Sequence, residues 1–125
     1  MDKNSNKRKS LFPLKTIKLF LDDIREPSFF DGYDGYAEPL EWVIVRSVEA
    51  AKRVLETRQV SHLSLDHDLG DKQPTGYDLC KWMSRVFTWP DNILFHSLSQ
   101  SGHEAMSVEY QSYISRQVKR QKRSK

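Results

Sequence analysis

Residues 63–70 read Leu-Ser-Leu-Asp-His-Asp-Leu-Gly, an apolar lead-in followed by an acid, an imidazole and a second acid. The lead-in predicts a buried strand, and Gly70 predicts the turn that ends this stretch. Three ionisable groups at the carboxyl end of a strand are costly as packing and useful as chemistry. Ligands of open α/β sheets bind just beyond the carboxyl ends of the strands. We therefore expect a functional site here if the other strands bring matching groups to the same edge.

The composition fits one small domain. The chain has 125 residues, of which 38% are hydrophobic and 30% are charged. It contains no apolar run of about 18 residues, so we expect no membrane contact. The N-terminus is polar and basic, unlike a secretion signal, and the single cysteine, Cys80, excludes both an internal disulfide and a zinc-binding cysteine pair. These features favour a reducing compartment, the cytoplasm.

The charge is distributed unevenly along the chain. Residues 1–10 carry a net charge of +3 and residues 116–125 carry +6, which leaves −6 for residues 11–115 because the total is +3. We expect a basic N-terminal arm over 1–13, a folded domain over 14–118 and a basic C-terminal tail over 119–125. The basic ends either attract a polyanion or protein partner or serve as solvated termini.

Four apolar runs predict strands, over residues 16–21, 41–46, 61–66 and 92–96. Residues 28–39 contain two glycines, a proline and four aromatic residues without a helical stripe, which predicts a long loop of the kind that forms lids.

Three helices are predicted between and after these strands. Ser47 is expected to cap a helix over 48–57, and a capping box at Thr75 to open a helix that ends near Phe87. A second capping box, Ser101-Gly102-His103-Glu104, is expected to open a long C-terminal helix. On the helix from Thr75 we expect Leu79, Met83 and Val86 to face inward. The C-terminal helix is expected to run over Met106, Tyr110, Ile114 and Val118. Alternating strands and helices predict a parallel sheet with right-handed crossovers.

Such a sheet brings ionisable residues from three strands to one edge. They are Asp22 and Asp23, then Asp66, His67 and Asp68, and finally His96 and Ser97. Converging carboxylates repel one another, and a hard divalent cation such as Mg²⁺ relieves that repulsion through oxygen ligands. Helix N-termini at Thr75 and Ser101 favour an anion. A cation site beside anion-binding helix ends predicts a phosphate site.

These residues resemble a known pattern. An acid pair after the first strand, an Asp after the third and a hydroxyl after the fourth look like the response-regulator receiver fold. More closely, LFLDDIREP (19–27), SLDHDLG (64–70), TGYDLCKWM (75–83) and FHSLSQSGHEAM (95–106) resemble the cyclic-phosphate-processing receiver domain family, over about residues 16–110. The resemblance implies a three-layer α/β domain with a four-stranded parallel sheet in the order 2-1-3-4 and helices on both faces. The chain departs from ordinary receivers, since it shows no fifth strand with its lysine.

Site roles follow from the residues and the resemblance together. Metal ligands for Mg²⁺ or Mn²⁺ are expected at Asp22, Asp23 and Asp66, and catalytic groups at His67, His96 and Asp66. Phosphate or substrate contacts are expected from Ser97, Thr75, Gly76, Ser101, Gly102 and Arg25, with Asp68 and Arg46 as additional candidates. For each, an ordinary structural role stays open: a carboxylate capping backbone N–H groups, a hydrogen-bonded histidine, a turn serine.

Two functions remain in competition. The first is metal-dependent processing of cyclic nucleotide phosphates, with 2′,3′-cyclic RNA ends as one substrate and the 28–39 loop over the base. The second is a non-catalytic regulatory module, including one of viral origin, that docks on a nucleic acid or protein machine through its basic ends. An ordinary receiver phosphorylated on Asp66 is disfavoured by the missing lysine.

Overall fold

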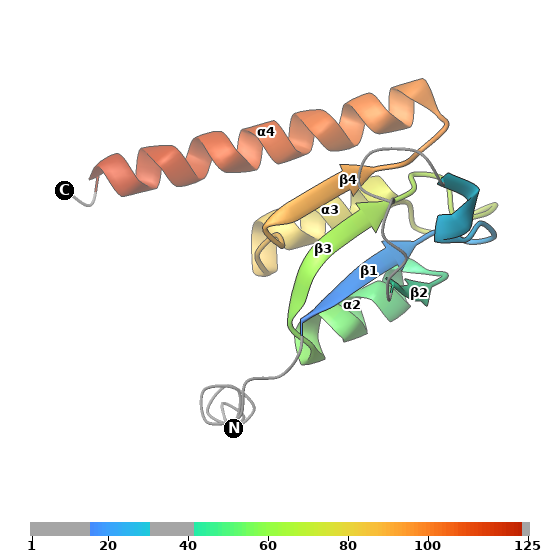
Figure 1. The fold of residues 1–125 in the computed structure, drawn as a ribbon. Helices are drawn as coiled ribbons and strands as arrows, with labels where there is room; N and C mark the ends of the chain where they lie inside the picture. The colour runs from blue at the N-terminus through green and yellow to red at the C-terminus, as the bar shows by residue number, and fades with distance from the viewer. Residues whose placement is uncertain (1–15, 31–41, 124–125) are drawn as a thin grey trace.

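The computed structural model describes residues 16–30 and 42–123, and Figure 1 shows their fold. The four strands are β1 (Ile17–Leu21), β2 (Trp42–Val45), β3 (Val60–Leu65) and β4 (Asn92–Phe95). They form one parallel sheet in the order β2-β1-β3-β4, which confirms the predicted order and direction.

The register places the ends of the strands side by side. Leu21 of β1 pairs with Val45 of β2 and with Leu65 of β3, and Leu65 pairs with Phe95 of β4. The residues after these positions therefore form one row along the edge of the sheet. Backbone hydrogen bonds continue into this row: the Asp66 N–H donates to the Leu21 carbonyl at 3.0 Å, and the His96 N–H donates to the Leu65 carbonyl at 2.9 Å.

Helices α2 (Val48–Thr57) and α3 (Gly76–Val86) begin where the sequence predicts. The Ser47 hydroxyl accepts from the Ala50 N–H, and Thr75 and Asp78 form the predicted capping box. The expectation that Val86 faces inward is wrong, because its surface is 67% exposed. The buried stripe of α3 passes through Leu79, Cys80 and Met83, and it continues at Phe87, which packs on the core.

Helix α4 (Gln100–Arg123) starts one residue earlier than the predicted box at Ser101. The Ser99 hydroxyl accepts from the Gly102 N–H at 3.1 Å, and the Ser99 carbonyl accepts from the His103 N–H at 2.9 Å. This is the geometry of an N-cap, so Ser99, not Ser101, caps α4.

The C-terminal part of α4 runs past the rest of the domain (Figure 1). Met106 is fully buried and Tyr110 packs on the core. Ile114 and Val118 are 40% and 46% exposed, whereas the neighbouring Tyr113 packs on the core. Residues 119–123 of the predicted tail are thus helical. Among the described helices, none is long and apolar enough to cross a membrane.

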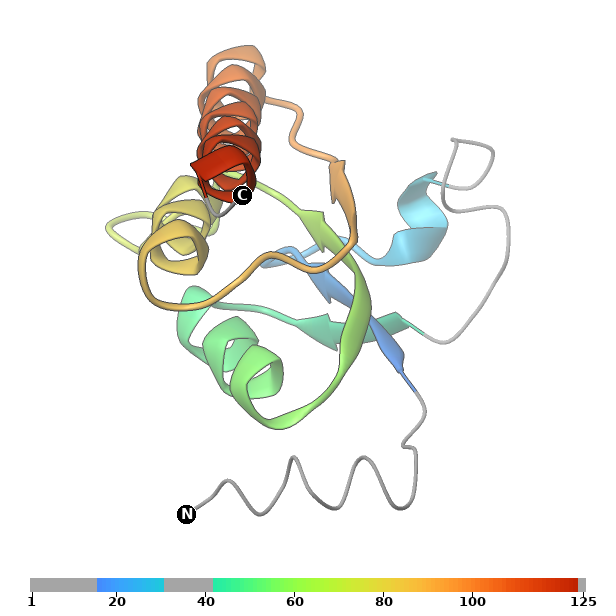
Figure 2. The ribbon, with the colours of Figure 1, turned by 90° about the vertical axis from the view of Figure 1, so that its left-hand side faces the viewer.

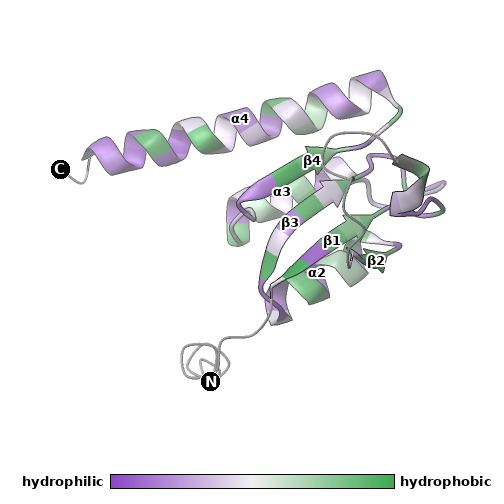
Figure 3. Ribbon diagram, in the orientation of Figure 1, coloured by the Kyte–Doolittle hydropathy of each residue, from purple (hydrophilic) through white to green (hydrophobic). Residues whose placement is uncertain are grey.

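The three α-helices of the described chain cover one face of the sheet (Figure 2). Apolar side chains from strands and helices meet there in one core, and Figure 3 shows the hydrophobic stretches of these elements. On the opposite face Phe20 packs with Trp42, Ile44 and Leu94. Helices on both faces are therefore not seen among the described residues. Between β1 and β2, the only helical element among the described residues is the 3-10 helix η1 (Pro27–Phe30). Most of the predicted 28–39 loop lies outside the described residues.

Candidate functional site

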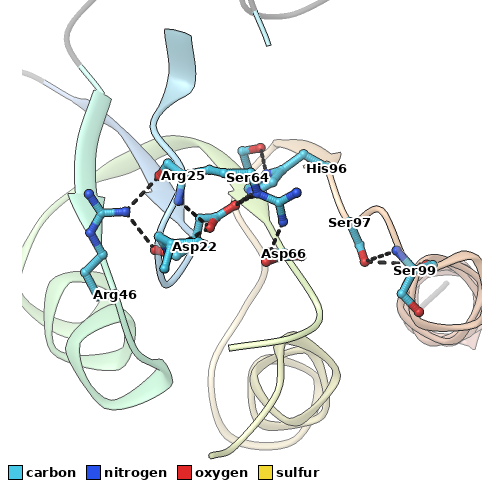
Figure 4. Close-up of polar contacts among 9 residues, drawn as sticks. Asp22, Arg25, Arg46, Ser64, Asp66, His96, Ser97 and Ser99 are labelled. Atoms are coloured by element: carbon cyan, nitrogen blue, oxygen red, sulfur yellow. Dashed lines mark hydrogen bonds and ion pairs between the residues drawn. The ribbon is translucent and has the colours of Figure 1, made fainter. Parts of the chain in front are cut away.

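Asp22, the first residue after β1, is fully buried, and both of its carboxylate oxygens are hydrogen-bonded (Figure 4). Oδ1 accepts from the backbone N–H groups of Ile24 and Arg25 at 3.0 and 2.8 Å. Oδ2 accepts from Arg25 Nε at 3.0 Å and from His96 Nε2 at 3.1 Å. Burial alone raises the pKa of this carboxyl, but the backbone donors and the Arg25 charge outweigh it and lower the pKa.

Arg25 joins Asp22 to Asp66, the first residue after β3. Its Nη2 donates to Asp66 Oδ2 at 3.0 Å, so one guanidinium bridges two buried carboxylates. Asp66 is 1% exposed. Burial and the neighbouring Asp22 charge raise its pKa, and the opposing effect of Arg25 does not cancel them. The edge of the sheet thus carries a carboxylate–guanidinium–carboxylate bridge.

His96, the first residue after β4, helps to position the Asp22 carboxylate. Its Nδ1 lies 2.6 Å from the Ser64 hydroxyl, and its ring stacks on Phe20 with centroids 4.4 Å apart. Burial lowers its pKa to about 4, despite the attraction of Asp22, so the ring is neutral near pH 7. Since a carboxylate only accepts, Nε2 carries the proton that is donated to Asp22, and Nδ1 accepts from Ser64.

Ser64 is a site residue without a predicted role. The sequence signal for this residue was a serine inside an apolar strand that is expected to be buried, because a buried hydroxyl needs a hydrogen-bond partner.

Arg46, the first residue after β2, holds the backbone of the Asp22–Arg25 turn. Its Nη1 donates to the carbonyl oxygens of Asp22 at 3.1 Å and Arg25 at 2.8 Å, and its Nη2 lies 3.3 Å from Glu26. Arg46 therefore fixes the shape of the turn (Figure 4).

An acidic pocket of about 640 Å³ opens in front of the bridge. Its lining residues come from the β1 end, the β3 end and the loop before α3: Asp23, Ile24, Arg25, Asp66, Asp68, Gly70, Asp71, Lys72, Gln73 and Thr75. The predicted residues Asp23, Arg25, Asp66, Asp68 and Thr75 are thus brought together. Asp71, Lys72 and Gln73 were missed, because an exposed loop has no periodicity to mark its inward residues.

Comparison with known families gives one informative result. The model of the cyclic-phosphate processing receiver domain matches residues 17–112, which hold the whole sheet, the pocket and the packed part of α4. The chain belongs to this family. Comparisons with curated proteins and with solved structures give no match. The family match therefore identifies this chain as a receiver domain linked to the processing of cyclic phosphates.

Several residues predicted as phosphate contacts have structural roles in this receiver domain. A Cβ at Gly76 would overlap the Asp66 backbone oxygen, and a Cβ at Gly102 would overlap the His67 side chain. These glycines let α3 and α4 approach the edge of the sheet. The Ser97 hydroxyl accepts from the Ser99 N–H at 3.1 Å. The residues that line the acidic pocket include none of Gly76, Gly102, Ser97, Ser101, His67, His96 and Arg46.

The donor chemistry of the receiver domain fits a hard divalent cation in part. Carboxylate oxygens of Asp22, Asp23 and Asp66 lie within 4.8 Å of one another, and such oxygens suit Mg²⁺ and Mn²⁺. Asp23 and Asp66 line the pocket. Asp22 already accepts four hydrogen bonds, so it fits as a ligand only after Arg25 turns away.

Proposed function

We propose that this receiver domain opens a cyclic nucleotide phosphate, such as a 2′,3′-cyclic RNA end, with Mg²⁺ or Mn²⁺ as its cofactor. The observation that supports this most is the joint lining of one pocket by the Asp23 and Asp66 carboxylates and the Arg25 guanidinium. Carboxylates hold a cation, and a guanidinium binds phosphate oxygens through paired N–H donors. A cyclic phosphate diester needs both, because charge builds on its oxygens as the ring opens.

The proposed roles follow the positions of the side chains. Asp66 and Asp23 hold the cation, with Asp22 beside them. When bound, the cation polarises a phosphoryl oxygen or lowers the pKa of a water. Arg25 and Lys72, which also line the pocket, bind the phosphate.

The overall reaction adds one water to phosphorus and breaks one P–O bond of the ring, and the released sugar oxygen takes a proton. We assign the proton transfers to Asp68, which lines the pocket; His67, proposed from the sequence, is not among the lining residues. His96, proposed from the sequence as an acid or base, is better suited to positioning Asp22, since both of its ring nitrogens have partners.

The test is turnover of 2′,3′-cyclic nucleotides and cyclic-ended RNA with Mg²⁺ or Mn²⁺, followed by ³¹P NMR. We expect a phosphomonoester product and a loss of about a hundredfold or more in Asp66→Asn and Asp23→Asn. Asp91→Asn is the matched control, because Asp91 is exposed and precedes β4 at the opposite end of the sheet. Absence of turnover with every cyclic substrate would exclude the proposed activity.

One observation favours the second function, a non-catalytic binding module. Arg25 already pairs with both buried carboxylates, so one positive charge offsets part of their repulsion without any added cation. Calorimetry with a non-hydrolysable cyclic phosphate distinguishes the two. Stoichiometric binding without turnover of the hydrolysable analogue would favour the binding module.

A further inference from the structure

We infer that Arg25 is a built-in competitor of the divalent cation: its side chain pairs with Asp22 and Asp66 in the free protein and must leave them when a metal binds the same carboxylate oxygens. This inference rests on the metal site of the proposed function, and it adds a mechanism that controls the affinity of that site.

The first argument is the position of the guanidinium. Arg25 Nε lies 3.0 Å from Asp22 Oδ2, and Arg25 Nη2 lies 3.0 Å from Asp66 Oδ2. These two oxygens belong to carboxylates that a shared cation would bridge. The oxygens cannot contact the guanidinium in this geometry and a metal ion in the same place. Binding of a metal through these two oxygens therefore requires the Arg25 guanidinium to leave both carboxylates.

The second argument is that the side chain can leave while the turn keeps its shape. The Arg25 N–H donates to Asp22 Oδ1 at 2.8 Å, and the Arg25 carbonyl accepts from Arg46 at 2.8 Å. Neither contact involves the guanidinium. The side chain is 19% exposed and borders the acidic pocket, where there is room for it to rotate.

The consequence is coupling between metal and phosphate. A guanidinium displaced from the carboxylates turns into the pocket, and a phosphate there would bind it. Any ligand that holds Arg25 away from Asp22 and Asp66 raises the affinity for the cation, and by linkage the cation raises the affinity for that ligand. We therefore expect weak binding of metal alone and tighter binding when inorganic phosphate is present.

The test is titration of metal-free protein with Mn²⁺ alone, with free Mn²⁺ measured by electron paramagnetic resonance. Arg25→Gln removes the competitor, so we expect Mn²⁺ to bind about tenfold tighter than to the wild type. Inorganic phosphate should tighten Mn²⁺ binding in the wild type and have little effect in Arg25→Gln.

Arg46→Gln is the matched control. It removes the same charge beside the same turn, but Arg46 donates to backbone carbonyls of the turn and lies near Glu26, not near the carboxylates of Asp22 or Asp66. Arg25→Lys keeps the charge and guards against misfolding of the glutamine variant, and we expect intermediate Mn²⁺ affinity. Circular dichroism confirms that each variant is folded.

Three results would overturn the inference: an equal gain in Arg46→Gln, which would reduce the effect to net charge; no gain in Arg25→Gln and Arg25→Lys; or no Mn²⁺ binding by any variant. The last would also remove the metal from the proposed function. Tight Mn²⁺ binding by Arg25→Gln, with no turnover of cyclic phosphates by the wild type, would leave the inference standing and exclude the activity alone.

Discussion

Asp22 and Asp66 are both buried acids at neighbouring strand ends, yet their surroundings shift their pKa values in opposite directions. Asp22 accepts two backbone and two side-chain hydrogen bonds, whereas Asp66 is paired with the Arg25 guanidinium. A lowered pKa means that the folded state favours the charged form, and a raised pKa means the reverse. The charged form of Asp22 therefore stabilises the fold, whereas the charged form of Asp66 lowers its stability. We attribute the presence of a buried charge at Asp66 to a functional role.

We predict that Asp22→Asn lowers the metal-free stability by about 3 kcal/mol, because four donors then face a neutral amide in place of a charged acceptor. Asp66→Asn should change it by less than about 1 kcal/mol, since the substitution relieves repulsion from Asp22 while weakening the pairing with Arg25. Denaturant unfolding in chelator measures both. In Mn²⁺, the wild type should gain stability and Asp66→Asn should gain none. A strongly destabilised Asp66→Asn protein in chelator would show that Asp66 is structural.

The neutral state of His96 gives a prediction for acid stability. Its pKa falls from 6.5 to about 4 on folding. Between these two pH values the His96 side chain is therefore protonated in the unfolded chain and neutral in the folded chain. Stability should therefore fall as the pH drops below 6.5, by about 3 kcal/mol once the pH reaches the folded value. Burial and Lys18 lower the pKa of His62, which adds to the fall, whereas the raised pKa of Asp66 opposes it near the acid end.

Urea unfolding in chelator between pH 6.5 and about 5 measures this slope. His96→Gln should flatten it, although the variant starts from a lower stability. His103→Gln, an exposed change on α4, should keep the wild-type slope. An unchanged slope in His96→Gln would mean that another group carries the proton linkage.

At the scale of elements, two serines at the start of α4, Ser99 and Ser101, have different roles. Ser99 accepts from the Gly102 N–H, while Ser101 is exposed. Ser99→Ala should cost about 1 kcal/mol, the usual value of an N-cap, and Ser101→Ala less than about 0.5 kcal/mol. Thermal melts of the two variants provide the measurement. Equal losses, or a larger loss in Ser101→Ala, would restore the capping box predicted from the sequence.

The elements themselves were predictable, because strands and helices leave periodic signals. The apolar runs over 16–21, 41–46, 61–66 and 92–96 predicted the four strands, and the shared edge followed from parallel topology. The Arg25 bridge to Asp66 was not predictable. It joins residues 41 positions apart in the sequence, and no local pattern encodes such a contact.

The two helix-start glycines show a different limit. Gly76 and Gly102 suited an anion site in the sequence, but their missing Cβ atoms make room for Asp66 and His67. A glycine required for close packing and one required for a ligand look the same until the neighbouring chain is placed.

At the scale of the whole molecule, α4 has two parts with different surroundings. Its first part packs on α3 and the core, and the family match ends at residue 112. Beyond it lie Arg116, Lys119, Arg120, Lys122 and Arg123 without an acid among residues 114–123. The mainly hydrophilic end of the helix extends into solvent (Figure 3). Because α4 continues to Arg123, the charges of Arg116, Lys119, Arg120 and Lys122 are carried by a helix and not by a tail without regular structure.

We predict that this basic end binds single-stranded nucleic acid by phosphate contacts, independently of the pocket. Changing Lys119, Arg120 and Lys122 to Gln keeps a good helix former at each position and removes three charges. For every phosphate that the helix no longer neutralises, the slope of log affinity against log salt should flatten by about 0.7. Fluorescence anisotropy with a labelled RNA across a salt series measures it. Turnover of a mononucleotide should not change, because all three residues lie outside the acidic pocket. A variant with wild-type RNA affinity and slope would show that the basic end of α4 makes no phosphate contacts, and that an RNA substrate would have to be held by the pocket alone.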